Sequence, residues 1–178
     1  MEKFDKLNDI KNTKFAQFNT KEEMVDTSFV ILTSLCPIII CRRDVMVEIN
    51  NLLRKYSNIL IHSSSVIIKC RVLHFISYYF EAMVHFPENQ EFSLKYLKFA
   101  IDMLNNQEDE NEAVRYTAIG TIKNILKLKR SPKVKDMLPA IQDSLFESLV
   151  LSLEENDNDD LLRIFTSIIG SKSAPIIA

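Results

Sequence analysis

The sequence predicts an all-α protein built as a solenoid of helix pairs, and three observations favour this fold. Apolar residues recur every three or four positions in segment after segment, which is the period of an amphipathic helix. Only 2 of the 178 residues are glycine, although about 7% is usual, so β-turns and phosphate-binding loops are disfavoured. A sequence pattern also recurs after 48 residues, as expected of a repeat architecture.

The helical stripes are clearest in the second half of the chain. Val114, Ala118, Ile122 and Ile125 step by four, four and three residues and so share one helical face. The same reasoning predicts helices over residues 21–36, 43–59, 64–84, 90–105, 111–128, 137–153 and 159–170.

Proline separates the predicted helices. Pro37 is expected to close the first helix, while Pro87 and Pro132 follow the third and the fifth. Pro139 is expected in the first turn of the sixth helix, where its missing N–H group costs nothing. Candidate N-cap residues are Asp109, Asn111, Asp157, Asn158 and Asp159.

The 48-residue pattern combines an apolar position with a small one. Val66, Val114 and Leu162 are expected to be equivalent and buried, and four positions later come the smaller residues Cys70, Ala118 and Thr166. Arg115 and Arg163 follow the apolar position, and Asp109 and Asp157 precede it by five residues, so each arginine could pair with an acidic cap in the adjoining repeat. The first copy departs from the pattern, since it has Ile67 in place of arginine and no aspartate cap.

Composition excludes several function classes. The net charge of −2 provides no basic field for nucleic acid. Cys36, Cys41 and Cys70 form no CxxC pair, which favours a reducing compartment. The N-terminus lacks the apolar core of a signal peptide. The longest apolar run, at residues 29–40, contains Pro37 and is shorter than the roughly 20 residues of a membrane span.

Candidate catalytic and metal-binding groups have simpler structural interpretations. Cys70 and His74 are four residues apart and could form a nucleophilic dyad, but Cys70 is better explained as the small interface residue of the repeat. His74 and His85 share a helical face roughly 16 Å apart, too far for one metal ion. We therefore expect no enzyme activity, catalytic residue, metal or cofactor.

Two acidic turns fall at the same position of the repeat. They can stabilise the positive ends of the helices that follow, and they could also form a negative rim that binds basic proteins. The rim residues are Glu108, Asp109, Glu110, Glu112, Glu154, Glu155, Asp157, Asp159 and Asp160. The aromatic residues between Phe75 and Phe86 are expected mostly in the core, with a minority available to an inter-repeat groove.

Short blocks of the sequence resemble a known family. The segment DENEAVRYTA resembles the second helix of a HEAT repeat. The series KCRVLHFISYYF, EAVRYTAIGTIKNIL and DMLPAIQDSLFESLVLSLEENDNDDLLRIFTSIIG is similar to the middle of importin-β-type karyopherins, above all the importin seven/eight group. The resemblance spans about residues 21–178 and implies a HEAT-repeat α–α superhelix.

The resemblance also implies a function. Such receptors shuttle between cytoplasm and nucleus and bind Ran-GTP, basic cargo such as histones or ribosomal proteins, and the Phe-Gly repeats of nucleoporins. The resemblance implies that Ran is held mainly by N-terminal repeats, which this chain does not match, so we expect Ran to bind mostly outside this segment. We expect residues 1–178 to form one continuous segment of about three to four repeats from a longer solenoid, with residues 1–20 partly disordered. Membrane and nucleic acid are not expected as partners. Other HEAT scaffolds, of phosphatases, chromosomes or translation factors, are the alternative, because they share the fold.

Overall fold

Every regular element that the structure describes is helical. A computed structural model describes residues 21–86, 90–105, 112–128, 131–155 and 159–172. None of these residues belongs to a β-strand, so the all-α prediction is confirmed. Residues 1–20, for which partial disorder was expected, lie outside the described part, as do Pro87 and the candidate caps Asp109, Asn111, Asp157 and Asn158.

The helices match the predicted ranges at most of their ends. They are α2 (Lys21–Ser34), α3 (Cys36–Ile39), α4 (Arg43–Ile61), α5 (Val66–Val84), α6 (Gln90–Asp102), the 3₁₀ turn η2 (Met103–Asn105), α7 (Glu112–Lys127), α8 (Pro132–Met137), the 3₁₀ turn η5 (Leu138–Ala140), α9 (Gln142–Glu155) and α10 (Asp159–Lys172). Predicted and observed ends agree within two residues except at 105, where η2 continues α6, and at 137.

The proline predictions need two corrections. The first helix ends at Ser34, and Pro37 lies in the first turn of the short helix α3 instead of closing α2. Pro139 lies in η5, so α9 begins only at Gln142. Proline has no N–H group for the helical ladder, and each proline here begins or occupies a short turn of its own. Pro132 follows α7 as predicted and also opens α8.

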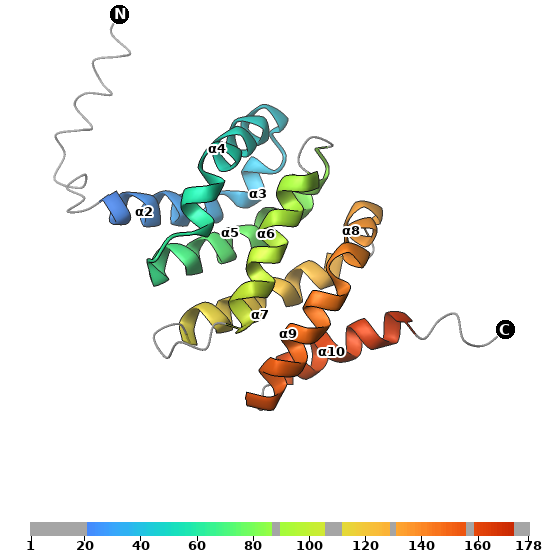
Figure 1. Cartoon of the computed structure of the whole chain (residues 1–178). Helices are drawn as coiled ribbons and strands as arrows, with labels where there is room; N and C mark the ends of the chain where they lie inside the picture. The colour runs from blue at the N-terminus through green and yellow to red at the C-terminus, as the bar shows by residue number, and fades with distance from the viewer. Residues whose placement is uncertain (1–20, 87–89, 106–111, 129–130, 156–158, 173–178) are drawn as a thin grey trace, which may run out of the picture.

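The long helices form two rows. In the first row α5 packs against both α2 and α7, and α10 packs against α7. In the second row α6 packs against α4 and α9. Figure 1 shows α6 and α9 running across the helices of the first row. Each second-row helix therefore covers the side of the first row from which apolar side chains project.

Hydrogen bonds join neighbouring helices of the first row. The hydroxyl of Tyr79 donates to the carbonyl oxygen of Leu32 at 2.6 Å, which joins α5 to α2. The hydroxyl of Thr121 donates to a carbonyl of α5 at 3.0 Å, and the amide of Asn124 donates to Ser77 at 2.8 Å. The partners are 47 or 48 residues apart, and their numbers rise together from α5 to α7. These two helices therefore run in the same direction.

The buried face of α5 recurs on α7 after 46 residues. The buried positions of α5 up to Phe80 each have a buried counterpart on α7, from Ile68 with Val114 to Phe80 with Leu126. Ile68, and not Val66 as predicted, is therefore equivalent to Val114. Val66 and Cys70 are half-buried. The 48-residue spacing belongs to the hydrogen bonds between the two helices, whereas the packing itself repeats after 46 residues.

The predicted third copy is shifted by one residue. Leu162, expected to be buried, is 45% exposed, and the side chain of Leu161 is buried in its place. Thr166 is also exposed, whereas Ile164 and Ile168 belong to the core. Val114 and Ala118 are fully buried as predicted. The rotation of α10 against α7 decides which side of its apolar stripe enters the core, and sequence spacing alone does not give that rotation.

Candidate protein-binding surfaces

The described members of the acidic rim lie at the beginnings of adjacent helices. Glu112 is the first residue of α7, Asp159 is the first residue of α10, and both are exposed. Because α7 and α10 pack together, these two carboxylates stand at the starts of two adjacent helices, and we call them the acidic edge. Glu154 and Glu155 end α9, but their side chains lie outside the described part, as do Glu108, Asp109, Glu110 and Asp157.

Asp160 has an intramolecular partner. Its carboxylate accepts a hydrogen bond from the ammonium of Lys123 at 2.6 Å, which ties the start of α10 to the second half of α7. This hydrogen bond, with the positive charge of Lys123, holds the pKa of the Asp160 carboxyl below its usual range. Both side chains are partly exposed, so the pair is screened by solvent. Asp160 therefore contributes first to the contact between the helices.

The repeat arginines differ in exposure. Arg115 is half-buried on α7, and Arg163 is exposed on α10. The aspartates expected to receive them from the neighbouring repeat, Asp109 and Asp157, lie outside the described residues. The predicted pairing of arginine with an acidic cap therefore stays a prediction.

The aromatic residues of α5 divide between core and surface. Phe75 and Tyr79 stack with centroids 4.2 Å apart, and Phe80 is fully buried. Tyr78 is 52% exposed, and with the half-buried Phe86 it lines a cavity of about 510 Å³ between the start of α4 and the end of α5. Ile40 also lines the cavity, and so do the charged residues Arg43 and Glu81. The apolar part of its lining and its opening to solvent suit a single aromatic or aliphatic side chain of a partner.

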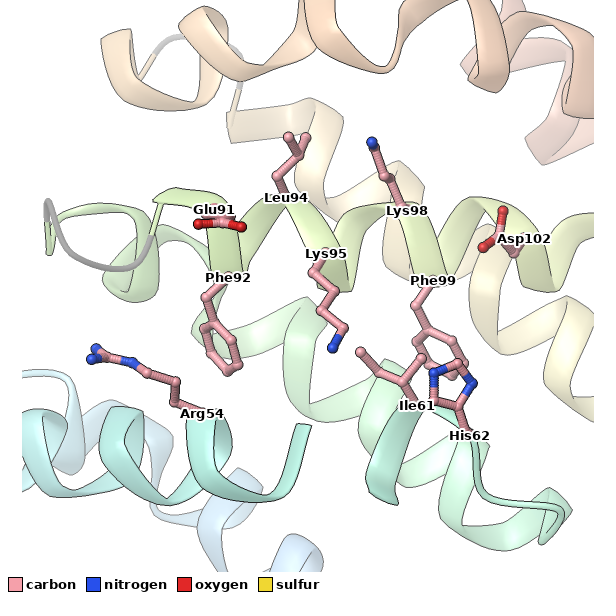
Figure 2. A pocket seen from close by; sticks show the side chains of 10 residues that line it. All are labelled: Arg54, Ile61, His62, Glu91, Phe92, Leu94, Lys95, Lys98, Phe99 and Asp102. Atoms are coloured by element: carbon pink, nitrogen blue, oxygen red, sulfur yellow. The ribbon is translucent and has the colours of Figure 1, made fainter. Parts of the chain in front are cut away.

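A second hollow lies between α4 and α6, and sequence reasoning did not find it. It encloses about 570 Å³. Figure 2 shows Phe92, Lys95 and Phe99 pointing from α6 toward α4, with Arg54 near one end. The ammonium of Lys95 donates a hydrogen bond to the amide oxygen of Asn58, and both phenylalanines are buried. Most of this surface is therefore the contact between two second-row helices.

The carboxylates near this hollow are poorly placed for acid–base catalysis. Glu91 and Asp102 both lie on α6, eleven residues apart. That spacing corresponds to roughly 16 Å along a helix, whereas paired catalytic carboxylates flank a single bond. The hollow therefore fits packing or peptide binding better than hydrolysis.

The cysteines and histidines lie in packing environments. Cys70 is half-buried against the core, and His74 makes an edge-on contact with Tyr78, with centroids 5.0 Å apart. The thiol of Cys36 is buried, which raises its pKa, and it donates to the carbonyl of Tyr78 at 3.7 Å. Within the described ranges, no three His, Cys, Asp or Glu side chains come together as metal ligands.

None of the described helices is long and apolar enough to span a bilayer.

A small hollow lies in the surface between α5 and α7. It encloses about 340 Å³ and is lined by Tyr116, Asn124, Gly120 and His74, among others. A Cβ atom added at Gly120 would meet nothing within 4 Å, so the glycine is not required by packing.

Comparisons with family models, curated proteins and solved structures found no match to this chain.

Proposed function

We propose that the chain is part of a HEAT-type α–α superhelix that binds other proteins without catalysing a reaction. The observation that carries the proposal is the recurrence of the same packing. The buried face of α5 is repeated on α7 after 46 residues, and hydrogen bonds join first-row neighbours whose numbers differ by 47 or 48. In solenoids each unit contacts mainly its neighbours, so stacked units leave long exposed surfaces. Such surfaces serve to bind extended or large partners.

The edge that carries Glu112 and Asp159 supports basic proteins as one class of partner. Exposed carboxylates at the starts of two adjacent helices add to a local negative field. The sequence supplies further acidic residues in the segments that precede both helices, Glu108–Glu110 and Asp157. Such a field steers positively charged partners and makes their binding sensitive to salt.

The cavity beside Tyr78 supports a second class of partner. Its size and its walls, with Tyr78, Phe86 and Ile40, fit the phenylalanine side chain of a Phe-Gly segment. The resemblance of the sequence blocks to importin-type receptors favours the same partners. On this basis we propose a nuclear transport role, in which the segment contributes to the binding of basic cargo and of Phe-Gly nucleoporins, under regulation by Ran-GTP.

Binding of the full chain to separate probes tests this function. The immobilised chain is exposed to a core histone, to a Phe-Gly repeat peptide, and to Ran loaded with GTP or with GDP. The histone and the peptide are expected to bind, and the peptide is expected to lose affinity when Tyr78→Ala removes the cavity wall. Tyr116→Ala is the matched control, since Tyr116 is equally exposed, at 52%, but lies outside this cavity.

The outcomes separate the two scaffold hypotheses. Peptide binding that is lost in Tyr78→Ala and kept in Tyr116→Ala supports the transport role. Histone binding without peptide binding assigns the chain to another class of HEAT scaffold. If neither probe binds at low salt, the protein-binding proposal fails.

A further inference from the structure

Exposed apolar side chains gather in a groove between α2 and α4. The groove encloses about 430 Å³. Its floor contains the buried Phe29, and its rims carry Met24 from α2 and Leu52, Tyr56 and Ile59 from α4. Leu52 is 54% exposed and Ile59 is 70% exposed. Exposed apolar surface of this kind marks a place where another segment packs.

The packing of α6 against α4 in the second row indicates which kind of segment packs in this groove. Buried positions of α4 recur on α6 after 43 residues, as in Ile49 with Phe92 and Leu53 with Tyr96. On this spacing the exposed Leu52 and Tyr56 correspond to Lys95 and Phe99 of α6. Lys95 and Phe99 point toward α4, the preceding helix of the second row (Figure 2). The corresponding face of α4 is therefore the face that would receive a helix preceding it.

The sequence before α2 carries the apolar pattern of such a helix. Phe4, Leu7, Phe15 and Phe18 have the spacing of four buried residues of α4. These residues of α4 are Met46, Ile49, Ser57 and Leu60, each 42 positions further along the chain. Positions separated by three, eight and three residues fall close to one face of a helix. The 42-residue shift is also close to the 43 residues that relate α4 to α6.

The connection to α2 has a suitable length. In the described part, α9 ends at Glu155 and α10 begins at Asp159, so three residues join a second-row helix to the next first-row helix. Phe18 precedes Lys21, the start of α2, by a similar distance in the sequence. Met24, in the first turn of α2, already lines the groove. The segment therefore needs only a short turn to reach it.

We infer that residues 4–18 of this chain bind the groove between α2 and α4 as a further helix of the second row. Phe4, Leu7, Phe15 and Phe18, at the positions of buried residues of α4, supply the apolar face of this helix. The groove is thus an intramolecular docking site, and this inference does not rest on the proposed function.

A single tryptophan at position 18 tests the docking, because the chain contains no other tryptophan. Phe18→Trp is made in the full chain, and its fluorescence is titrated with acrylamide. In the docked state the indole is shielded, so its emission is shifted to the blue and its quenching constant is several-fold lower than in urea. Quenching equal to that of the urea-unfolded chain would overturn the inference.

A pair of groove variants shows where the indole binds. Ile59→Asp places a charge on the rim of the groove and is expected to raise the quenching constant to the unfolded value. Ile67→Asp is the matched control, since Ile67 is 53% exposed on α5 and does not line the groove. Equal quenching in the two variants would contradict the assignment. Shielding that disappears on dilution would assign the groove to a second copy of the chain instead, and circular dichroism melts verify that each variant is folded.

Discussion

The hydroxyl of Thr121 on α7 lies 3.0 Å from the carbonyl oxygen of Leu73 on α5, 48 residues earlier in the chain. It lies 2.8 Å from the carbonyl of Thr117 in its own helix, so its single proton is shared between two acceptors. Thr121 and Leu73 are both buried. The hydroxyl of Thr121 therefore bonds to a carbonyl of its own helix and also fixes the axial position of α7 relative to α5.

Removing this hydroxyl is expected to destabilise the protein. Thr121→Val keeps the shape of the side chain but removes the donor, which should cost about 1 kcal/mol of unfolding free energy. Thr117→Val is the matched control, because Thr117 donates only within α7, to Ala113 at 2.7 Å. Urea unfolding measures both changes. A loss as large in Thr117→Val as in Thr121→Val would show that the contact with α5 contributes nothing.

Ala118 is expected to tolerate no larger side chain. It is fully buried in the core, on the face of α7 that repeats the packing of α5. Ala118→Leu should overpack this contact and lower stability by about 1–3 kcal/mol. Ala113→Leu, at an exposed position of the same helix, should change stability by less than about 0.5 kcal/mol. Thermal melts that coincide for parent and Ala118→Leu would disprove tight packing at this position.

Gly120 offers a stabilising substitution. It lies inside α7, has no positive φ angle, and has open space where a Cβ atom would stand. Gly120→Ala should therefore raise the unfolding free energy by about 0.5–1 kcal/mol, because alanine loses less backbone entropy in a helix. Chemical unfolding at neutral pH checks this. A destabilised variant would mean that the space beside Gly120 closes in solution.

The Lys123–Asp160 pair makes a pH-dependent contribution. Since the folded-state pKa of Asp160 is lowered, its contribution is fully present above the unfolded-state value of about 4 and is lost as pH falls through the folded-state pKa. Asp160→Asn should cost at most about 1 kcal/mol at pH 7, because the pair is partly exposed. Unfolding of parent and variant is compared from pH 7 down to the lowest pH at which both fold. A stability difference that grows as the carboxylate becomes protonated would contradict this sign.

The acidic edge is expected to bind basic proteins through its charge. Glu108→Gln, Glu110→Gln, Glu112→Gln and Asp159→Asn together should weaken histone binding several-fold at low salt, with a smaller effect at high salt. The matched control neutralises the exposed residues Glu48, Glu81, Asp136 and Glu147, which changes the net charge equally. Asp159 can also stabilise the start of α10, so melts accompany the binding curves. Equal weakening by both sets would mean that net charge, and not the edge, determines binding.

The sequence pattern was sufficient for most of the secondary structure. The stripes of α4, α5 and α7 follow the helical period closely enough for their ends to be predicted within two residues. It was not sufficient between residues 131 and 141, where α8 and η5 stand in place of a loop and a helix start. Pro132 and Pro139 both favour helical turns there, and only their packing decides where the long helix begins. The groove between α2 and α4 and the hollow between α4 and α6 were also missed, because each is formed by side chains from two helices.

By itself, the sequence determined that this protein is helical, which residues form the apolar face of each helix, and that the pattern repeats. These properties follow from local spacing, since residues three and four apart share a helical face wherever the helix lies. Only the tertiary structure decided the register, with Ile68 equivalent to Val114 and Leu161 buried in place of Leu162. It also assigned Asp160 to Lys123. The reason is physical: the rotation and height of one helix against the next depend on how side chains of both interlock, and no single helix carries that information.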